Sequence, residues 1–354
     1  MLENKLYEII GKIMPPDRDA MEKARARQES LAKPPGSLGG LEDISVKMAG
    51  ITGNVKNRIE KSCVVVLCAD NGVVAEGVTQ SGQEVTAIVA ENFLDCNTSA
   101  AIMCKKAGVD LFPIDIGMAV DTRVPDYKVA YGTKNMAREP AMTREEAIQS
   151  VMTGIQIAIE KKEEGYQILA TGEMGIGNTT TSSAVASVLL NRPVEFMTGR
   201  GAGLTSEGLN RKIQTIEKAI SLHQPDPQDA LDVLSKVGGF DLAGLAGIYL
   251  GGAYCHLPVV MDGFISAVAA LIAARICPDA REYMIASHVS KEPGMHVILE
   301  ELNLSASLDC HMCLGEGTGA VAFLPVLEMA LEVYHKMSTF SENNIEDYEE
   351  LGDR

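Results

Sequence analysis

The sequence predicts a doubly wound, Rossmann-like α/β fold built on a mostly parallel six-stranded sheet. Six short apolar runs, rich in β-branched residues, alternate along the chain with segments of helical periodicity. Each run ends in glycine and polar residues before the next helical segment begins. Continuously apolar strands that alternate with helices are typical of a parallel sheet covered by helices on both faces.

The six predicted strands share one pattern, in which an apolar run is followed by a turn and then by a helix. In chain order they lie within residues 62–72, 108–118, 166–178, 258–264, 282–290 and 311–319. The last of them, "HMCLGEGTG", passes into the helical segment "AVAFLPVLEMAL". We expect these units to form one large domain over residues 30–325.

Both ends of the chain have helical periodicity outside this alternation. Leu6, Ile9, Ile10 and Ile13 share one face of an N-terminal helix, and "DRDAMEKARARQESLA" follows as a second, polar helix. The segment "FLPVLEMALEVYHKMSTFSE" near the other end is also helical. The pattern predicts one small helical domain formed by residues 1–29 together with residues 326–354.

Charge and hydropathy argue against two classes of function. The formal net charge of −17 disfavours binding to the phosphate backbone of nucleic acids. The longest apolar run, residues 264–274, is too short to span a bilayer, and the first residues lack a signal-peptide pattern. We therefore expect a cytoplasmic protein that acts on small molecules and binds neither nucleic acid nor membrane.

The eight cysteines are expected to be free thiols. Cys310 and Cys313 form a C-x-x-C pattern, for which a redox or metal site is one interpretation. The interpretation we favour is a buried strand whose small residues are cysteines. The six histidines are scattered without an H-x-x-x-H pair, so no metal site or other cofactor is expected.

Polar residues follow nearly every predicted strand. In a doubly wound sheet the ligand binds beyond the carboxyl ends of the strands, so these residues are expected to converge on one site. They are Asp70, Asn71 and Gly72, then Asp115, Glu173 with Asn178, Asp262, Ser287 to Ser290, and Glu316.

Two glycine-rich stretches are candidates for binding an anion. In "TGEMGIGNTTTSSA", the glycines up to Gly177 precede a helix that opens with Asn178, and glycines before a helix N-terminus suit a phosphate. Because Asn178 replaces the lysine of a P-loop, a monophosphate fits better than a triphosphate. The alternative is an ordinary capped turn. The second stretch, "TGRGAGLTSEGLNRKI", carries Lys212, which the residues alone suggest is a solvated surface lysine.

Two carboxylates and a small-residue helix complete the pattern. Glu173 and Glu316 each lie in a glycine-flanked loop, where an apolar pocket would raise the pKa toward that of a general base. The alternative is that each caps a helix or pairs with a cation.

The stretch "SKVGGFDLAGLAGIYLGGA" predicts a tightly packed helix through Gly244, Gly247 and Gly251, with Asp241 favouring its dipole.

Six motifs together resemble the nicotinate-nucleotide–dimethylbenzimidazole phosphoribosyltransferase family. They are "KPPGSLGGLE", "ADNGVVAEGV", "GEMGIGNTT", "DVLSKVGGFDLAG", "PVVMDGF" and "LGEGTGA", and they extend from about residue 15 to 340 in the family's order. The resemblance implies transfer of the 5-phosphoribosyl group of nicotinate mononucleotide to 5,6-dimethylbenzimidazole, giving α-ribazole 5′-phosphate and nicotinate. It also implies a homodimer whose partner subunit helps to close each site, and no metal.

The same resemblance assigns roles to individual residues. Glu316 matches the general base that takes the benzimidazole proton during inversion at C1′. Glu173 and Lys212 match further catalytic positions, which overrides the surface interpretation of Lys212. The matching substrate-binding positions are Ser81, Gly175, Gly177, Asn178, Thr179, Gly201, Gly203, Asp262, Ser290 and Gly315.

Two positions depart from the family. Asn71 stands where many members have histidine, and Val89 stands where some have glutamine near the base pocket. A more apolar wall at Val89 could favour other benzimidazoles, adenine or a phenolic acceptor. A nucleotide-binding sensor without chemistry is a further alternative, which the intact Glu173, Lys212 and Glu316 disfavour.

Overall fold

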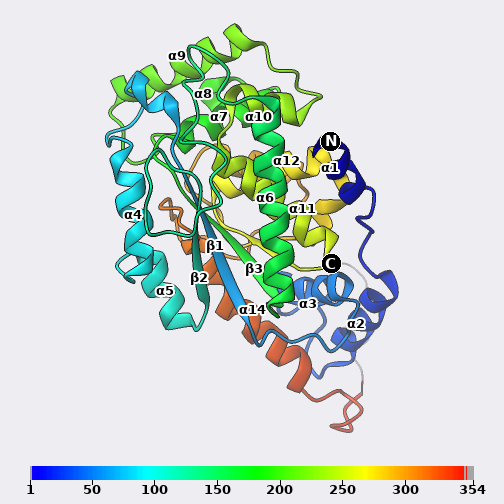
Figure 1. Ribbon diagram of the computed structural model, residues 1–354. Helices are drawn as coiled ribbons and strands as arrows, with labels where there is room; N and C mark the ends of the chain where they lie inside the picture. Colours follow the sequence, from blue (N-terminus) through cyan, green and yellow to red (C-terminus); the bar gives the residue numbers. More distant parts are fainter. Residues whose placement is uncertain (1, 347, 349–354) are drawn as a thin grey trace.

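The computed structural model describes residues 2–346 and 348 and follows the predicted alternation of strands and helices (Figure 1). Its sheet has five parallel strands in the order β2-β1-β3-β4-β5. The strands are β1 (Ser62–Ala69), β2 (Asp110–Gly117), β3 (Ile168–Met174), β4 (Val259–Met261) and β5 (Met284–Ala286). The strand order reverses between β1 and β3, which is the switch point where doubly wound sheets bind ligands.

The predicted sixth strand is wrong. Residues 310–316 form a loop, because His311, Gly315, Glu316 and Gly317 have φ angles of 54°, 87°, 62° and 85°. Left-handed residues cannot continue a strand. The buried-strand interpretation of the C-x-x-C pattern fails with it, since Cys310 and Cys313 are both exposed.

Helices cover both faces of the sheet, and β1 shows why. Val65 and Leu67 point into one hydrophobic cluster, while Val64 and Val66 point into another, as successive strand residues must. The first cluster includes α6 (Arg144–Glu163), α7 (Asn178–Leu189), α10 (Ala230–Val237), α11 (Phe240–Tyr254) and α12 (Phe264–Ile276). The second includes α3 (Gly40–Thr52), α4 (Glu84–Leu94), α5 (Ser99–Ala107) and α14 (Thr318–Lys336).

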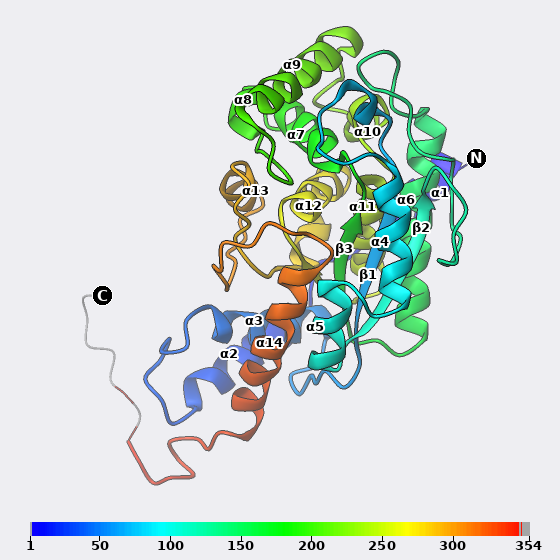
Figure 2. The ribbon, with the colours of Figure 1, turned by 90° about the vertical axis from the view of Figure 1, so that its left-hand side faces the viewer.

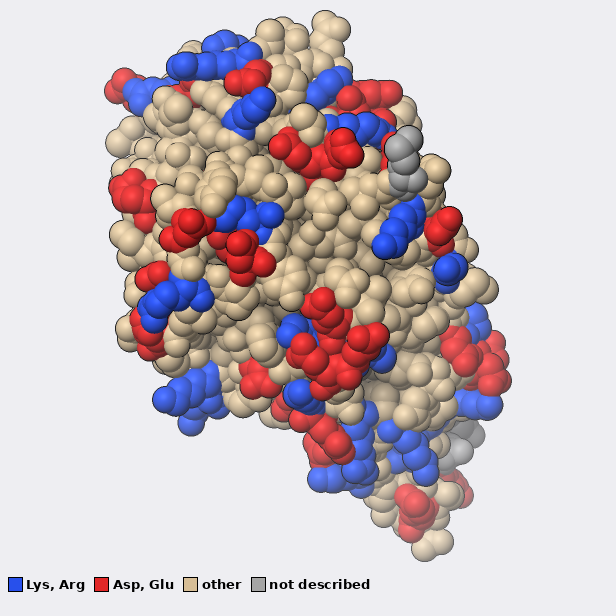
Figure 3. Space-filling view, in the orientation of Figure 1, with Lys and Arg blue, Asp and Glu red and all other residues tan. Residues whose placement is uncertain are grey.

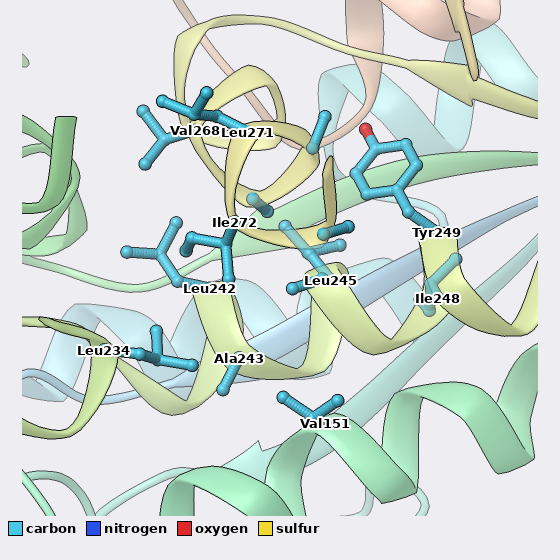
Figure 4. Packing of buried hydrophobic residues seen from close by; sticks show 14 of the residues in the cluster. Val151, Leu234, Leu242, Ala243, Leu245, Ile248, Tyr249, Val268, Leu271 and Ile272 are labelled. Atoms are coloured by element: carbon cyan, nitrogen blue, oxygen red, sulfur yellow. The ribbon is translucent and has the colours of Figure 1, made fainter. Parts of the chain in front are cut away.

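Helix α11 is buried along almost its whole length, between α6 and α12 (Figure 4). Leu242 and Leu245 lie in this core with Leu271 of α12. A Cβ added to Gly247 would lie 2.0 Å from the carbonyl oxygen of Val151, so only glycine permits this approach of α6. The predicted tight packing of this helix is confirmed.

The remaining elements lie around this framework. They are α1 (Leu2–Ile10), α2 (Arg18–Ser30), α8 (Val194–Met197), α9 (Ser206–His223), α13 (Met295–Glu301) and the 3₁₀ segments Gly72–Glu76 and Pro278–Tyr283. On the face seen in Figure 3, acidic and basic side chains lie interspersed.

Segments from the two ends of the chain meet beside the large sheet. Helix α2 packs on α3, and both lie next to α14 (Figure 2). The guanidinium of Arg27 donates hydrogen bonds of 3.1 Å to the carbonyl oxygens of Tyr334 and His335, in the last turn of α14. Helix α1 instead packs on α6 and α11. The boundaries of the small domain stay a prediction.

Candidate active site

The ends of β1, β3 and β4 bring the predicted residues together. A Cβ added to Gly175, just after β3, would lie 2.5 Å from the carbonyl oxygen of Ala69 and 3.2 Å from Nδ2 of Asn71, which follows β1. The chain after β3 therefore runs close against the chain after β1 at the switch point. Asp115 of β2 is committed elsewhere, because it forms a buried ion pair of 2.5 Å with Lys128.

A buried acid cluster forms around Asn178, the first residue of α7. Its Nδ2 donates to Oε2 of Glu173 and, at 3.1 Å, to Oδ2 of Asp241. Burial, followed by the charge of Asp241, raises the pKa of Glu173 to about 8. Burial likewise raises the pKa of Asp241 to about 6. At neutral pH this cluster retains a proton, mainly on Glu173.

Asp241 belongs to the buried acid cluster, whereas the sequence pattern predicts only that it favours the dipole of α11. Nothing near it in the sequence distinguishes it from an ordinary residue of a first helical turn. Its complete burial next to Glu173 results from the packing of α11 against β3, which spacing alone does not reveal.

Asp262 and Glu316 meet at the N-terminus of α14. The carboxylate of Asp262 accepts hydrogen bonds from the backbone N–H groups of Gly319 (2.7 Å), Ala320 (3.1 Å) and Gly317 (3.1 Å). It thus caps the helix that begins two residues after Glu316. Both oxygens of Asp262 therefore accept hydrogen bonds from the helix, and its role in substrate binding stays a prediction.

Glu316 has an unused carboxylate oxygen. Its Oε2 is buried without a hydrogen-bond partner, although the residue as a whole is half-buried. Burial raises the pKa of Glu316, and the charge of the Asp262 carboxylate raises it further. The backbone N–H of Ala100 favours the charged form and lowers the pKa in part. A carboxylate in this state can accept a proton from a ligand.

Main-chain contacts join Glu316 to Glu173. A Cβ on Gly172 would lie 2.9 Å from the carbonyl carbon of Glu316, and a Cβ on Gly315 would lie 2.3 Å from Oε1 of Glu173. Gly315 also has a φ of 87°, which favours glycine. Gly172, which precedes Glu173 in β3, and Gly315, which precedes Glu316, therefore allow the end of β3 and the Glu316 loop to approach closely.

Lys212 forms a second centre and is not a surface residue, because only 1% of it is exposed. Its Nζ donates to Oγ1 of Thr179 at 2.8 Å and to the carbonyl oxygen of Gly199 at 3.3 Å. A Cβ on Gly201 would lie 3.6 Å from Nζ of Lys212. Burial lowers the pKa of Lys212 to about 8, against the raising effect of the Glu292 carboxylate.

The N-termini of α7 and α14 differ in a way that matters for anions. Both helices begin after a glycine in the left-handed region, Gly177 and Gly317. The amides at the start of α14 are occupied by Asp262, whereas no side chain caps α7. The backbone N–H groups of Asn178 and Thr180 donate to the carbonyl oxygens of Gly175 and Gly177, so it is the helix dipole together with Lys212, which contacts Thr179, that suits an anionic group.

Comparison with known proteins identifies the family. A family model described as "Phosphoribosyltransferase" matches residues 13–345. A protein from Clostridium tetani is 44% identical over 351 residues, which cover 98% of this chain and 97% of the relative. One from Acetivibrio thermocellus is 46% identical over 347 residues, covering 97% and 99%. Both are named nicotinate-nucleotide–dimethylbenzimidazole phosphoribosyltransferase. The chain belongs to this phosphoribosyltransferase family.

Solved structures of the phosphoribosyltransferase family have the same fold. The crystal structure of CobT from Thermus thermophilus is 40% identical, has a TM-score of 0.89 and covers 93% of this chain and 100% of its own. A second structure from the same organism, named as this phosphoribosyltransferase, is 39% identical with a TM-score of 0.88. The predicted family and the α/β fold with a parallel sheet are confirmed.

The other predicted residues of this phosphoribosyltransferase lie around the two centres. Ser81 is exposed, but its neighbour Gln80 donates from Nε2 to the carbonyl oxygen of Gly203, so its loop touches the second glycine stretch. Ser290 is buried. Of the two positions that depart from the family, Asn71 is buried and lies at the switch point, whereas Val89 is half-buried on α4. The sequence therefore named residues of both centres.

Within residues 2–346, no group of three or more histidine, cysteine or acidic side chains is arranged to hold a metal ion. Over the same residues, no helix is long and apolar enough to cross a membrane.

Proposed function

We propose that the protein transfers the 5-phosphoribosyl group of nicotinate mononucleotide to 5,6-dimethylbenzimidazole, giving α-ribazole 5′-phosphate and nicotinate. Membership of the family supports the reaction. The observation that carries the proposal is the unpartnered carboxylate oxygen of Glu316 at the same sheet edge as the acid cluster of Glu173. The cationic Lys212 centre supplies a place for the phosphate.

The phosphate of the nucleotide binds at Lys212 and the start of α7. A lysine ammonium has three N–H donors, and Thr179 and Gly199 accept two of them, which leaves one for a ligand. In this proposal the phosphate reaches Lys212 past residues of both glycine stretches and Ser290, namely Gly175, Gly177, Gly201, Gly203 and Ser290. A monophosphate matches one lysine and one uncapped helix N-terminus better than a triphosphate does.

Glu316 is the general base, and Glu173 is not. With a pKa raised to about 8, Glu173 is mostly protonated at neutral pH and cannot accept a further proton. Glu316 removes the N–H proton of the benzimidazole while the other ring nitrogen attacks C1′ of the ribose. The C1′–N bond to nicotinate breaks on the opposite face, so the configuration inverts. Protonated Glu173 is a hydrogen-bond donor for a ribose hydroxyl.

The acceptor base, the assembly and the compartment remain part of the proposal. Val89 makes another benzimidazole, adenine or a phenolic compound the alternative acceptor. We further propose a homodimer, no cofactor, a cytoplasmic location and a small helical domain formed by residues 1–29 and 326–354. Sedimentation of the purified protein tests the homodimer, and a monomer at micromolar concentration would contradict it.

The reaction is tested by incubating the protein with nicotinate mononucleotide and a panel of bases while nicotinate release is measured. Release with 5,6-dimethylbenzimidazole supports the proposal. Release only with other bases supports the alternative acceptor. Binding of the nucleotide without release for any base would leave a sensor and would contradict the proposed reaction.

A further inference from the structure

Glu292 is a buried carboxylate that reaches the second glycine stretch from another part of the fold. It lies in the loop between β5 and α13, and its side chain runs against Gly199, where an added Cβ would be 1.9 Å from Oε2 of Glu292. Burial raises the pKa of Glu292, while the charge of Lys212 and the backbone N–H of Gly201 lower it and favour the charged form, and Oε2 is buried without a hydrogen-bond partner.

The same carboxylate is coupled to Lys212. Lys212 is held by Thr179 and by the carbonyl oxygen of Gly199, neither of which titrates. Glu292 is the charged group that stabilises the ammonium form of Lys212 against its burial. The Glu292 carboxylate thus lies against the second glycine stretch, and its negative charge stabilises the ammonium form of Lys212. The backbone N–H of Glu292 donates a hydrogen bond of 3.4 Å to Oγ of Ser290, another of the predicted substrate-binding residues.

We propose that Glu292 is a positioning residue that holds the Gly199–Gly203 loop and Lys212 in the arrangement that receives the phosphate of the nucleotide. The inference rests on the proposed function, because it assigns Glu292 to the phosphate end of that site. Glu292 touches no reacting atom in this scheme. It acts through Lys212 and the loop, so its removal affects binding of the phosphate more than the chemical step.

Two effects of the Glu292 charge oppose each other, and they predict opposite results. The carboxylate keeps Lys212 cationic, which attracts a phosphate, but it also repels the phosphate directly. The phosphate would contact Lys212 and the start of α7, whereas the Glu292 carboxylate lies against Gly199 on the other side of the loop residues that it supports. We therefore expect the support of Lys212 to exceed the repulsion.

The test compares Glu292→Gln with the unchanged protein, since glutamine keeps the acceptor oxygen and the volume but removes the charge. Glu195→Gln, an exposed position on α8, is the matched control. The dissociation constants of nicotinate mononucleotide and of nicotinate riboside, which lacks the phosphate, are measured without an acceptor base between pH 7 and 9. In this range the phosphate of the nucleotide is a dianion.

We expect Glu292→Gln to weaken binding of the nucleotide about tenfold, with little change for the riboside. The loss of nucleotide binding with rising pH, which follows Lys212 near pH 8 in the unchanged protein, should shift to lower pH in the variant. Equal or tighter nucleotide binding in the variant, or equal losses for nucleotide and riboside, would overturn the assignment. Failure of the unchanged protein to bind the nucleotide would instead contradict the proposed function.

Discussion

The backbone N–H of Gly319 donates a hydrogen bond of 2.7 Å to Oδ1 of Asp262. Asp262 follows β4, whereas Gly319 lies in the first turn of α14, so the bond connects the sheet to the helix that Glu316 precedes. The backbone N–H groups of Gly317 and Ala320 donate two further hydrogen bonds to the same carboxylate. Asp262 therefore holds the first turn of α14, directly after Glu316, against the end of β4.

Replacing Asp262 with asparagine should lower kcat by about 10- to 100-fold through misplacement of Glu316. Asparagine offers one acceptor oxygen and turns its amide donors toward N–H groups. The capping loss should cost about 1–2 kcal/mol of the free energy of unfolding. Steady-state kinetics and denaturant unfolding measure both effects, with the exposed Asp279→Asn as control. A rise in KM for the nucleotide with unchanged kcat would instead favour direct substrate binding by Asp262.

Glu316→Gln should reduce turnover by roughly 10²–10⁴-fold, the range for loss of a proton-transfer group. Binding of nicotinate mononucleotide should change little, because the phosphate end of the site is intact. Single-turnover release of nicotinate and a separate binding titration distinguish the two. Glu332→Gln, exposed on the same helix, should behave like the unchanged protein. Unchanged turnover in Glu316→Gln would remove Glu316 from the mechanism.

Glu173 should make stability fall as the pH rises from about 5 to 8. Its pKa is about 8 when folded against an ordinary value of 4.5, so the folded state binds more protons than the unfolded state between these values. The free energy of unfolding therefore decreases with pH in this window. The Glu173→Gln protein, which cannot ionise there, should show a flatter profile in urea unfolding measured at each pH. Identical slopes in the two proteins would contradict the buried, protonated state of Glu173.

Gly315→Ala should lose activity beyond what backbone strain explains. Gly108 provides the control, because its φ is also positive, at 72°, and an added Cβ there meets no atom within 4 Å. Gly108→Ala should therefore cost only the left-handed strain of about 1–2 kcal/mol and keep its turnover. A Cβ on Gly315 would in addition push Oε1 of Glu173 away from its place. Equal turnover in both variants would show that the contact is unimportant.

Cys310 and Cys313 should react with iodoacetamide much faster than the buried cysteines. Both are exposed, whereas burial raises the pKa of Cys63 and raises that of Cys104 to about 12. A thiol reacts as its thiolate, so burial slows the reaction twice, by access and by ionisation. Mass spectrometry of the timed reaction identifies the labelled positions. Early labelling of Cys63 would contradict the position of β1 in the core.

The first five strands could be predicted because continuous apolar runs and following glycines are local signals. The sixth could not, since "HMCLGEGTG" has the composition of a strand end, while its exposure and left-handed residues are decided by tertiary structure. Lys212 shows the same limit: helical spacing placed it on a surface, and only its packing against Thr179 and Gly199 buries it.

The buried carboxylates also differ in whether a local sequence signal marks them. Glu173 and Glu316 were found because each follows an apolar run within a glycine-rich turn. Asp241 and Glu292 lack that signal. The rule that polar residues after a strand belong to the site reached Ser290 but stopped two residues short of Glu292, whose contacts with Gly199 and Gly201 depend on how distant loops fold together.

Helix α14 is fastened at both ends, by Asp262 at its first turn and by Arg27 at its last. Its 19 residues span about 28 Å, and Pro325 lies in the helix interior. Helix α14 therefore connects α2, where Arg27 lies, to the loop that carries Glu316, so the N-terminal helices help to support the candidate active site.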